Sequence, residues 1–389
     1  MAAVVSPAIP TPHQTAEPID PYRVGPGTLA GRYLRLFWQP VYIASDLPAG
    51  KARPIRVMGE NFTLYRGESG EPHVVDFRCA HRRTQLSIGW VEGDAIRCRY
   101  HGWSYDPTGQ CIEQPGEREP FCQKVKIGGY PTQEYLGLIF AYLGEGDPPS
   151  LPRFPLGEQD GVIETLTYVR RCSFLNNSEN DPLHVYFVHP RPGYDRHDWR
   201  VIPTITAEET DYGMLEHLTR ADGRLSQTTQ VMPNISYRPY RKEQGDTIPT
   251  THIAYRVPID DESHRSFLVE IVHLTGEEAE RYKASRDPAH LRPYDHTNEL
   301  TDQVLAGTLD LDELRGSHLL SASLGNVQDG SSQEGQGAIP DRENEHLGQS
   351  DASVVLLRRL WARELQNLAE GRPIKRWTLP PARDLGVED

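Results

Sequence analysis

The first half of the chain alternates short strand-like runs with residues that form turns. Residues 1–27 are rich in proline and small residues, and they predict an irregular arm. Thr28 then stands as a candidate N-cap for a short helix over residues 31–38. From residue 41 to residue 143 the runs are bounded by Gly, Pro or Asp, which predicts a small all-β unit. These runs lie at residues 54–59, 61–67, 73–77, 95–100 and 136–143.

The second half carries further strand-like runs and ends in an amphipathic helix. Residues 144–155 concentrate Pro and Gly without an apolar period, so they predict a linker. Residues 275–316 are charged and poor in aromatics, and they predict either a mobile cover or a helical crossing segment. A helix over residues 350–371 is expected to begin at Ser350 or Asp351 and to end at Gly371. Strands are expected at residues 162–175, 214–220, 226–233, 251–259 and 265–274, with a hairpin turn at 260–263.

Composition narrows the kind of protein. Of the 389 residues, 37% are hydrophobic and 25% are charged, which is typical of a globular chain in water. The formal net charge of −14 disfavours nucleic acid as a partner, since proteins that bind phosphates carry a basic excess. Neither an apolar run of the about 18 residues that a membrane span requires nor a secretory signal is evident, so we expect a cytoplasmic protein without membrane contact. Five cysteines, an odd number, favour metal ligation or burial over a disulfide framework.

Two short motifs place four soft metal ligands close together in the sequence. Cys79 and His81 form one pair and Cys98 and His101 the other, in the pattern Cys-x-His-x16-Cys-x2-His. Two thiolates and two imidazoles suit an iron–sulfur pair in which one iron takes both cysteines and the other both histidines. A structural zinc site is the alternative, but zinc knuckles normally place two or more residues between their ligands. The other cysteines are expected to be buried thiols; they are Cys111, Cys122 and Cys172.

A second motif, about eighty residues further on, predicts a mononuclear metal site. Asp181 is followed by His184 and His189, in the pattern Asp-x2-His-x4-His. A spacing of five is not ideal on one helix face, but a helix that loosens near Pro190 can bring both rings to one metal. Two imidazoles and one carboxylate make the facial triad of non-haem Fe(II) oxygenases, which leaves positions open for O2. Taken alone, the motif is only moderately specific, because histidines that face solvent or cap a helix fit it too.

With both motifs in one chain, the sequence resembles the Rieske [2Fe–2S] aromatic-ring oxygenases. Residues 101–106, followed by Gly109 and Pro115, are similar to the second cluster loop of that family. The respiratory type of Rieske domain has two further cysteines where this chain has Thr84 and Tyr100. The domain therefore resembles the oxygenase type, which has no disulfide between its loops.

The resemblance extends over nearly the whole chain and implies an α+β fold with two main parts. An N-terminal all-β Rieske [2Fe–2S] domain is expected over residues 41–145. A catalytic domain of the helix-grip type, with an antiparallel sheet around a long helix, is expected over residues 146–389. Residues 1–40 are expected to form an arm and a helix that packs on the catalytic domain.

The resemblance also implies the ligands of the mononuclear iron. In the phthalate-dioxygenase-like branch, the Asp of a Gln-Asp pair that precedes a Gln-Glu pair supplies the carboxylate. Here that residue is Asp329, which would join His184 and His189. Glu334 and Asp341 are competing carboxylates, for which a surface or salt-bridge role is the simpler interpretation.

One further carboxylate has a different implied role. In the family, the residue equivalent to Asp181 connects a Rieske histidine of one subunit to an iron-ligating histidine of its neighbour, so it would link His101 or His81 to the iron site across an interface. This implies oligomerisation, and the related members assemble as homotrimers. Either Asn177 or Asn180 is expected to face the iron, since Asn180 directly precedes Asp181 here.

The implied function is that of a terminal oxygenase. Using O2 and electrons from a separate reductase or ferredoxin, it would hydroxylate or O-demethylate an aromatic substrate. Its cofactors would be a [2Fe–2S] Rieske cluster and a mononuclear Fe(II), and NAD(P)H would act only through the partner reductase, since no dinucleotide fingerprint is evident. The alternatives are a cis-dihydroxylating dioxygenase of an aromatic carboxylate or aryl ether, and an electron-transfer Rieske protein without oxygenase activity.

Several arginines close to the cluster ligands stand out in this acidic chain. They favour the docking of an acidic electron donor by electrostatic steering. Pairing with nearby carboxylates explains them equally well, because surface ion pairs are often incidental. The residues are Arg78, Arg82, Arg83, Arg97 and Arg99.

Overall fold

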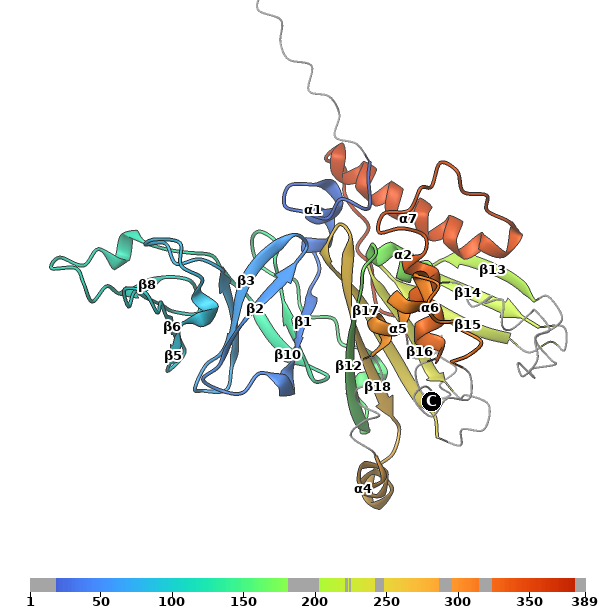
Figure 1. Ribbon diagram of the computed structural model, residues 1–389, viewed down its shortest axis with the longest axis horizontal. Coiled ribbons are helices and arrows are strands. Elements are labelled where there is room, and N and C mark those ends of the chain that lie inside the picture. Colours follow the sequence, from blue (N-terminus) through green and yellow to red (C-terminus); the bar gives the residue numbers. More distant parts are fainter. Residues whose placement is uncertain are drawn as a thin grey trace, which may run out of the picture.

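A computed structural model describes most of the chain. The described residues are 19–180, 203–220, 223, 225–241, 248–286, 296–314 and 324–381. Within them the molecule is elongated, with small sheets at one end and a large sheet covered by helices at the other (Figure 1). In the part of the chain that is described, no helix combines the length and the apolarity that crossing a membrane would take.

Small antiparallel sheets build the first part of the molecule. Their strand orders are β1-β11-β10, β2-β3-β4-β9 and β5-β6-β7-β8. The predicted strand-like runs are confirmed, except that β6 ends at Arg97, so residues 98–100 lie in a loop. The bounds are β1 Gln39–Ile43, β2 Ala52–Val57, β3 Glu60–Arg66, β4 Pro72–Asp76, β5 Trp90–Glu92, β6 Ala95–Arg97, β7 Ser104–Tyr105, β8 Cys111–Glu113, β9 Gly129–Tyr130, β10 Thr132–Tyr135 and β11 Leu138–Ala141.

A large antiparallel sheet forms the second part. In the described residues its order is β12-β18-β17-β16-β15-β14-β13. The predicted hairpin is confirmed: Asp260 pairs with Ser263, and its carboxylate accepts a 2.7 Å hydrogen bond from the Ser263 hydroxyl. The strands β13 and β16 were not expected from the sequence. The bounds are β12 Val162–Arg170, β13 Thr204–Glu209, β14 Gly213–Thr219, β15 Leu225–Val231, β16 Ile235–Arg241, β17 Thr250–Asp260 and β18 Ser263–Val272.

Helices cover one face of the large sheet. The helix α7 lies along β13 and β14, while α2, α5 and α6 lie in front of the sheet (Figure 1). We call the sheet face toward these helices the inner face. The α-helices are α1 Leu29–Arg35, α2 Phe174–Ser178, α4 Gly276–Ser285, α5 Thr297–Leu305, α6 Leu324–Glu334 and α7 Ala352–Ala369. The 3₁₀ helices are η1 Ala44–Asp46, η2 Leu86–Ile88, η3 Cys122–Lys124, η4 Pro155–Glu158 and η7 Gln349–Asp351.

The helix predictions were right in kind and inexact in their limits. The Thr28 cap is confirmed, since its hydroxyl accepts from the Gly31 N–H, but α1 begins and ends earlier than expected. The long C-terminal helix is confirmed, with Asp351 at its N-cap. The strand expected over residues 162–175 was wrong beyond Arg170, because Ser173 caps the short helix α2.

One continuous hydrophobic core joins two of the small sheets to the large one, whereas the sheet β5-β6-β7-β8 packs in a second, smaller core. The larger core includes buried side chains of β1, β3 and β11 together with those of β17, β18 and α7. Tyr33 of α1 and Phe174 of α2 both pack edge-on against Trp361 of α7, with ring centroids 5.3 and 5.4 Å apart. Trp361 is 1% exposed, so it anchors both short helices on the long one. The expected domain boundaries at 40/41 and 145/146 stay predictions.

Candidate functional site

Two loops of similar geometry carry the Cys and His residues of the first motif. In the first, the Cys79 carbonyl accepts a hydrogen bond from the Arg83 N–H, and in the second, the Cys98 carbonyl accepts one from the Gly102 N–H. The fourth residue after each cysteine is in the left-handed region, with φ of 61° at Arg83 and 77° at Gly102. Each loop thus turns back sharply after its cysteine, and this directs its histidine toward the other loop.

The four predicted cluster ligands divide into a buried pair and an outer pair. Cys79 and Cys98 are 1% and 2% exposed, whereas His101 is exposed and His81 is half-buried. The two imidazole rings lie 4.6 Å apart between centroids. The Tyr105 hydroxyl lies 3.2 Å from the Cys79 sulfur. Inner sulfur ligands and outer nitrogen ligands are the division that a [2Fe–2S] pair with two ligands per iron requires.

This donor set fits a two-iron cluster better than a single ion. Among the residues that the structure describes, no group of three or more His, Cys, Asp or Glu side chains is placed to hold one metal ion. A Rieske cluster does not need such a group, because each of its irons takes two protein ligands. The Trp103 ring stacks on His81 at 4.6 Å with planes 7° apart, which fixes the orientation of that imidazole.

Of the remaining cysteines, Cys111 and Cys172 are buried as expected. Cys122 is only partly buried, so that expectation was wrong for it. It lies in η3, a short surface turn that does not cover it completely.

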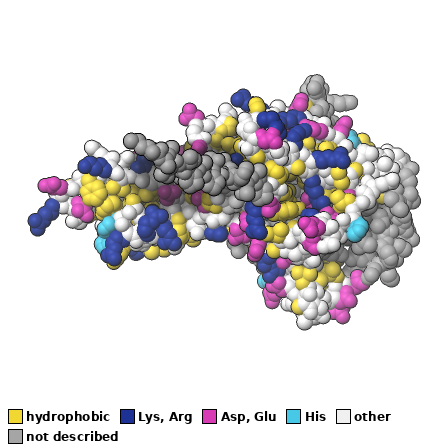
Figure 2. Space-filling model, turned by 90° about the horizontal axis from the view of Figure 1, so that it is seen from above, with side chains coloured by type: hydrophobic (Ala, Val, Ile, Leu, Met, Phe, Trp, Pro, Cys, Tyr) yellow, Lys and Arg dark blue, Asp and Glu magenta, His cyan; other side chains and the backbone are white. Residues whose placement is uncertain are grey.

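The surface around the cluster loops is basic and apolar. Figure 2 shows Lys, Arg and His side chains beside hydrophobic ones at this end of the molecule. Arg99 stacks over Trp90 at 4.2 Å and Arg82 over Tyr100 at 5.5 Å, so the charges rest on aromatic rings rather than on carboxylates. The exposed apolar side chains here are Ile88, Trp90, Tyr100, Ile112 and Phe121.

One of the five arginines does not belong to this surface. Arg97 pairs with Glu92 at 2.8 Å and with Glu113 at 2.5 Å, and it also donates to the Gly102 carbonyl. Its charge is therefore neutralised within the domain, and it holds the second cluster loop in place. The other four have no ion pair with a described residue, and we call them the cluster arginines: Arg78, Arg82, Arg83 and Arg99.

The second motif is only partly visible. Asp181, His184 and His189 lie outside the described residues. Asp329 is described on α6, and its Oδ2 accepts a 3.3 Å hydrogen bond from the Asn180 amide. Asn180 stands two residues after the end of α2, so the residue just before the motif reaches the carboxylate that the resemblance assigns to the same iron.

The two candidate asparagines point in different directions. Asn177 turns toward the large sheet, where its amide lies 3.0 Å from the Tyr168 hydroxyl and 2.9 Å from His264 Nε2. Asn180 contacts Asp329 instead. Of the two, Asn180 is therefore the one beside the candidate iron ligand.

The competing carboxylates are engaged elsewhere. Glu334, with a side chain 5% exposed, accepts three hydrogen bonds from Arg171, two from its guanidinium and one from its backbone N–H. Asp341 is exposed and accepts from the Asn344 amide. These are the salt-bridge and surface roles that the simpler interpretation gave them.

A close approach of two helices positions Asp329. Gly330, the next residue, packs against Thr301 of α5, and a Cβ atom there would lie 2.9 Å from the Thr301 hydroxyl. Any larger residue would push α5 and α6 apart and move the carboxylate beside it.

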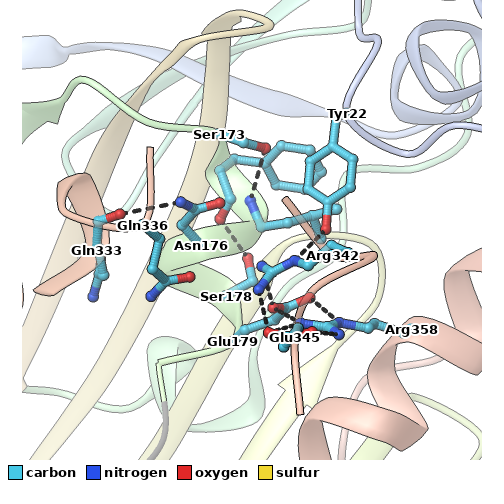
Figure 3. A network of polar contacts seen from close by, with 12 residues as sticks. Tyr22, Ser173, Asn176, Ser178, Glu179, Gln333, Gln336, Arg342, Glu345 and Arg358 are labelled. Atoms are coloured by element: carbon cyan, nitrogen blue, oxygen red, sulfur yellow. Dashed lines mark hydrogen bonds and ion pairs between the residues drawn. The ribbon is translucent and has the colours of Figure 1, made fainter. Parts of the chain in front are cut away.

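A network of charges that sequence reasoning missed holds the end of α2. Glu179 is 6% exposed and accepts from Arg342 at 2.7 Å and from Arg358 at 2.7 and 2.8 Å. Glu345 pairs with the same two arginines, and the Tyr22 hydroxyl accepts from Arg342 at 3.0 Å. Figure 3 shows the two carboxylates between the two guanidiniums. The network joins the N-terminal arm, α2 and α7 at the residue just before Asn180.

We expect Glu179→Gln to lower the free energy of unfolding by about 3 kcal/mol, because it leaves two partly buried guanidiniums with one carboxylate between them. Urea unfolding of the metal-loaded protein measures this. Glu209→Gln is the matched control, since Glu209 also binds α7 through Arg363 but its side chain is 34% exposed. In the control variant, the free energy of unfolding should fall by no more than about 1 kcal/mol. Equal losses in both variants would contradict the importance of the buried network.

A cavity lies next to this segment on the inner face of the sheet. It is a small hollow of about 10 Å³, room for roughly one water molecule, and it is bounded by the end of α2, by β14 and β15, and by the first turns of α7. Asn180, Gln230 and Leu357 are among its lining residues. The cavity thus reaches the asparagine that contacts Asp329.

Comparison with known proteins identifies the class of the N-terminal domain. Residues 37–133 match the model of the Rieske [2Fe–2S] domain, which includes both cluster loops. The large sheet follows this domain, and solved structures with the same arrangement are terminal oxygenases. One is that of carbazole 1,9a-dioxygenase from Novosphingobium sp. KA1, with a TM-score of 0.63, 19% identity, and coverage of 86% of this chain and 95% of that one. Another is a fluorene-bound oxygenase in complex with ferredoxin, with a TM-score of 0.60 and 20% identity over 86% of this chain and 93% of that one.

Curated relatives narrow the class to a family. The chain is 30% identical to the oxygenase subunit of 5,5'-dehydrodivanillate O-demethylase from Sphingobium sp., over 92% of this chain and 82% of that protein. It is also 30% identical to the alpha subunit of phenoxybenzoate dioxygenase from Ectopseudomonas oleovorans, over 90% and 84%. The chain belongs to the oxygenase subunits of the Rieske oxygenases, and it is an oxidoreductase that incorporates O2.

Proposed function

We propose that this chain O-demethylates an aryl methyl ether as the oxygenase component of a multi-protein system. The observation that supports an oxygenase site is the Asn180–Asp329 contact on the inner face of the large sheet, in a chain whose cluster loops form a separate end (Figure 1). The relative named as an O-demethylase supports the choice of reaction. Cis-dihydroxylation is the second candidate, because a relative named as a dioxygenase is equally similar.

In this proposal the residues hold two iron groups. Cys79 and Cys98 hold one iron of the cluster, and His81 and His101 hold the other. Asp329 holds the mononuclear iron together with the two histidines of the second motif, His184 and His189. When bound, these groups supply one-electron transfer and the activation of O2. The protein orients them: Asn180 holds the Asp329 carboxylate, and α2 and α7 pack over the inner face of the large sheet.

Electron transfer is proposed to cross a subunit interface. Asp181 would accept imidazole N–H bonds from a cluster histidine of one subunit and from His184 of the next, so the working unit is a homotrimer. The position of the cluster loops at the far end of each chain supports this, since Asp329 lies on the other part of the molecule (Figure 1). We place the protein in the cytoplasm, with NAD(P)H oxidised by the partner reductase.

The cluster arginines are proposed to dock an acidic electron donor. We expect Arg82→Glu combined with Arg83→Glu to slow cluster reduction about tenfold and to flatten its dependence on salt, because steering by opposite charges would be lost. Stopped-flow reduction by a surrogate plant-type ferredoxin measures both effects. Arg281→Glu with Lys283→Glu on α4 makes the same change in charge at a distant exposed site and should leave the rate unchanged. Unaltered reduction in the first variant would remove this role.

The proposed reaction is tested by product analysis with labelled O2. The reconstituted oxygenase, supplied with a surrogate reductase, is offered methoxyarenes, phenoxy and chloro aromatics, and aromatic carboxylates. One labelled oxygen in the product together with released formaldehyde establishes O-demethylation. Two labelled oxygens on the ring would instead make the chain a dihydroxylating dioxygenase.

A further inference from the structure

Two buried guanidiniums lie on the inner face of the large sheet. Tyr168 of β12 pairs with Ser266 of β18, which pairs with Arg256 of β17, so all three side chains share one face. Arg170 lies two residues after Tyr168 and therefore faces the same way. The guanidinium carbons of Arg170 and Arg256 lie 4.8 and 5.9 Å from the centre of the Tyr168 ring.

Neither guanidinium has a carboxylate partner among the described residues. Arg170 is 2% exposed and donates to the Gln333 side chain and, at 3.5 Å, to the Asn326 carbonyl, while its Nε is buried without an acceptor. The Nε and Nη1 atoms of Arg256 are also buried without an acceptor in the described part of the chain.

Other charges on the same face are paired. Glu164 accepts from Arg286 at 2.6 and 2.7 Å, and Glu270 lies 2.5 Å from His252. These two carboxylates are therefore engaged and do not serve as counter-ions to Arg170 or Arg256. Burying a cation without a partner is costly, so a site of this kind is expected to receive an anion.

Neighbouring groups report the same positive potential. Burial opposes ionisation of the Tyr168 phenol, yet Arg170 and Arg256, together with hydrogen bonds from Asn177 and Ser266, lower the pKa of Tyr168 below its ordinary value. Burial lowers the pKa of His264 to about 3, and both arginines act in the same direction, against a hydrogen bond to the Cys172 carbonyl. The histidine is therefore neutral and adds no further cation.

Arg170 and Arg256 lie close to Asp329, the candidate iron ligand. The two α6 contacts of Arg170, Asn326 and Gln333, stand three residues before and four residues after Asp329, on the same side of the helix. Asn177 connects Tyr168 to α2, whose following residues lead to Asn180 and so to Asp329.

The cavity opens onto the same face of the sheet. Gln230, which lines it, pairs with Ser236 of β16, and Ser236 pairs with Ala254 of β17, the inward-facing residue next to Arg256. Two strand spacings separate β15 from β17, which is about 10 Å. The hollow itself ends at β15, so an aromatic ring would have to lie over β16 for its charged substituent to reach Arg256.

We propose that Arg256 and Arg170 bind the carboxylate of an aromatic acid and so orient its ring toward the iron site. This inference rests on the proposed function and adds that the substrate carries a negative charge. Arg256, which has two donors without acceptors, makes the direct contact, and Arg170 holds the position relative to α6. Substrate selection then depends on a negative charge at a fixed distance from the carbon that is oxidised.

The test compares 3-methoxybenzoate with 3-methoxybenzamide, which differ in charge and hardly in shape. Calorimetry on the cluster- and iron-loaded protein should show that the acid binds at least about 30-fold more tightly than the amide. Arg256→Gln should abolish this preference, and Arg256→Lys should keep part of it. Arg265→Gln removes a charge from the opposite face of the same sheet and should leave the preference intact.

Each contrary outcome overturns the inference. Equal binding of acid and amide by the unaltered protein would do so without any variant, as would a preference that survives Arg256→Gln. A preference that appears only in Tyr168→Phe would show that the Tyr168 phenolate is an internal counter-ion. Turnover of neutral methoxybenzene distinguishes a failure of the carboxylate site from a failure of the proposed O-demethylation. If methoxybenzene is demethylated as well as the acid, the proposed function stands although the carboxylate site does not. If no methoxyarene is bound or oxidised, both proposals fail.

Discussion

Replacing Asp329 with alanine is expected to leave the [2Fe–2S] cluster in place and to remove the mononuclear iron. The variant would lose the one anionic ligand that the proposed site has, and turnover should fall by at least about 100-fold, since even changes to groups that only support a ligand cost 10- to 100-fold. Metal analysis together with the EPR spectrum of the reduced cluster distinguishes the two iron groups in one sample.

Two further variants distinguish the ligand role of Asp329 from the roles of Glu334 and Asp181. Glu334→Ala removes the competing carboxylate, which is engaged with Arg171, and should retain the mononuclear iron. Asp181→Ala should retain both iron groups and fail in coupled turnover, because the proposed bridge between subunits would be lost. If iron stays bound in Asp329→Ala and leaves in Glu334→Ala, the ligand role passes to Glu334.

Cys98→Ser is expected to abolish the cluster, its red-brown colour and all turnover. A serine hydroxyl does not replace a thiolate on a soft iron–sulfur centre, and the remaining three ligands leave one iron half-bound. Because Cys98 belongs to the small core of the cluster subdomain, this part of the protein should also become more susceptible to proteolysis. Visible absorption and limited proteolysis measure the two effects.

Cys122→Ser is the matched control for this change. It replaces a cysteine by a serine in the same subdomain, at a partly buried position that no ligand motif includes. The control should keep its colour and its resistance to protease. Loss of colour in both variants would mean that the serine substitution acts through packing rather than through ligation.

Local sequence predicted the cluster loops well, because their chemistry and their turns depend on neighbouring residues. The pattern of Cys79 and His81 predicted a pair of ligands from one short segment, and the structure places both in one loop with a sharp turn at Arg83. The division into buried cysteines and outer histidines could not be read from spacing. It depends on the packing of Tyr105 and Trp103 beneath the loops.

The strands that escaped prediction are those with little apolar alternation. β13 is polar along most of its length, and β16 contains Pro239, so neither carries the pattern of a half-buried strand. Both are strands because the hydrogen-bonding edges of β14, β15 and β17 are available to them. The converse error occurred after Arg170, where Ser173 begins a helix within a run that looked like a strand.

The charge network and the arginine pair lay beyond sequence reasoning for a different reason. Glu179 meets Arg358 across 179 residues of chain, and Arg256 reaches Tyr168 only through the register of β18. Neither pairing has a local signal.

The continuous core has a consequence for how electrons travel. Because β1 and β11 share buried side chains with β17 and β18, the sheet β1-β11-β10 cannot move against the large sheet without exposing that core to water, and the cluster ligands stand next to it in a separate small core. The chain is therefore no tethered shuttle that collects an electron at one place and delivers it at another. In the proposed homotrimer, the tunnelling distances on either side of the cluster would then depend on how the donor and the neighbouring subunit bind next to this fixed sheet.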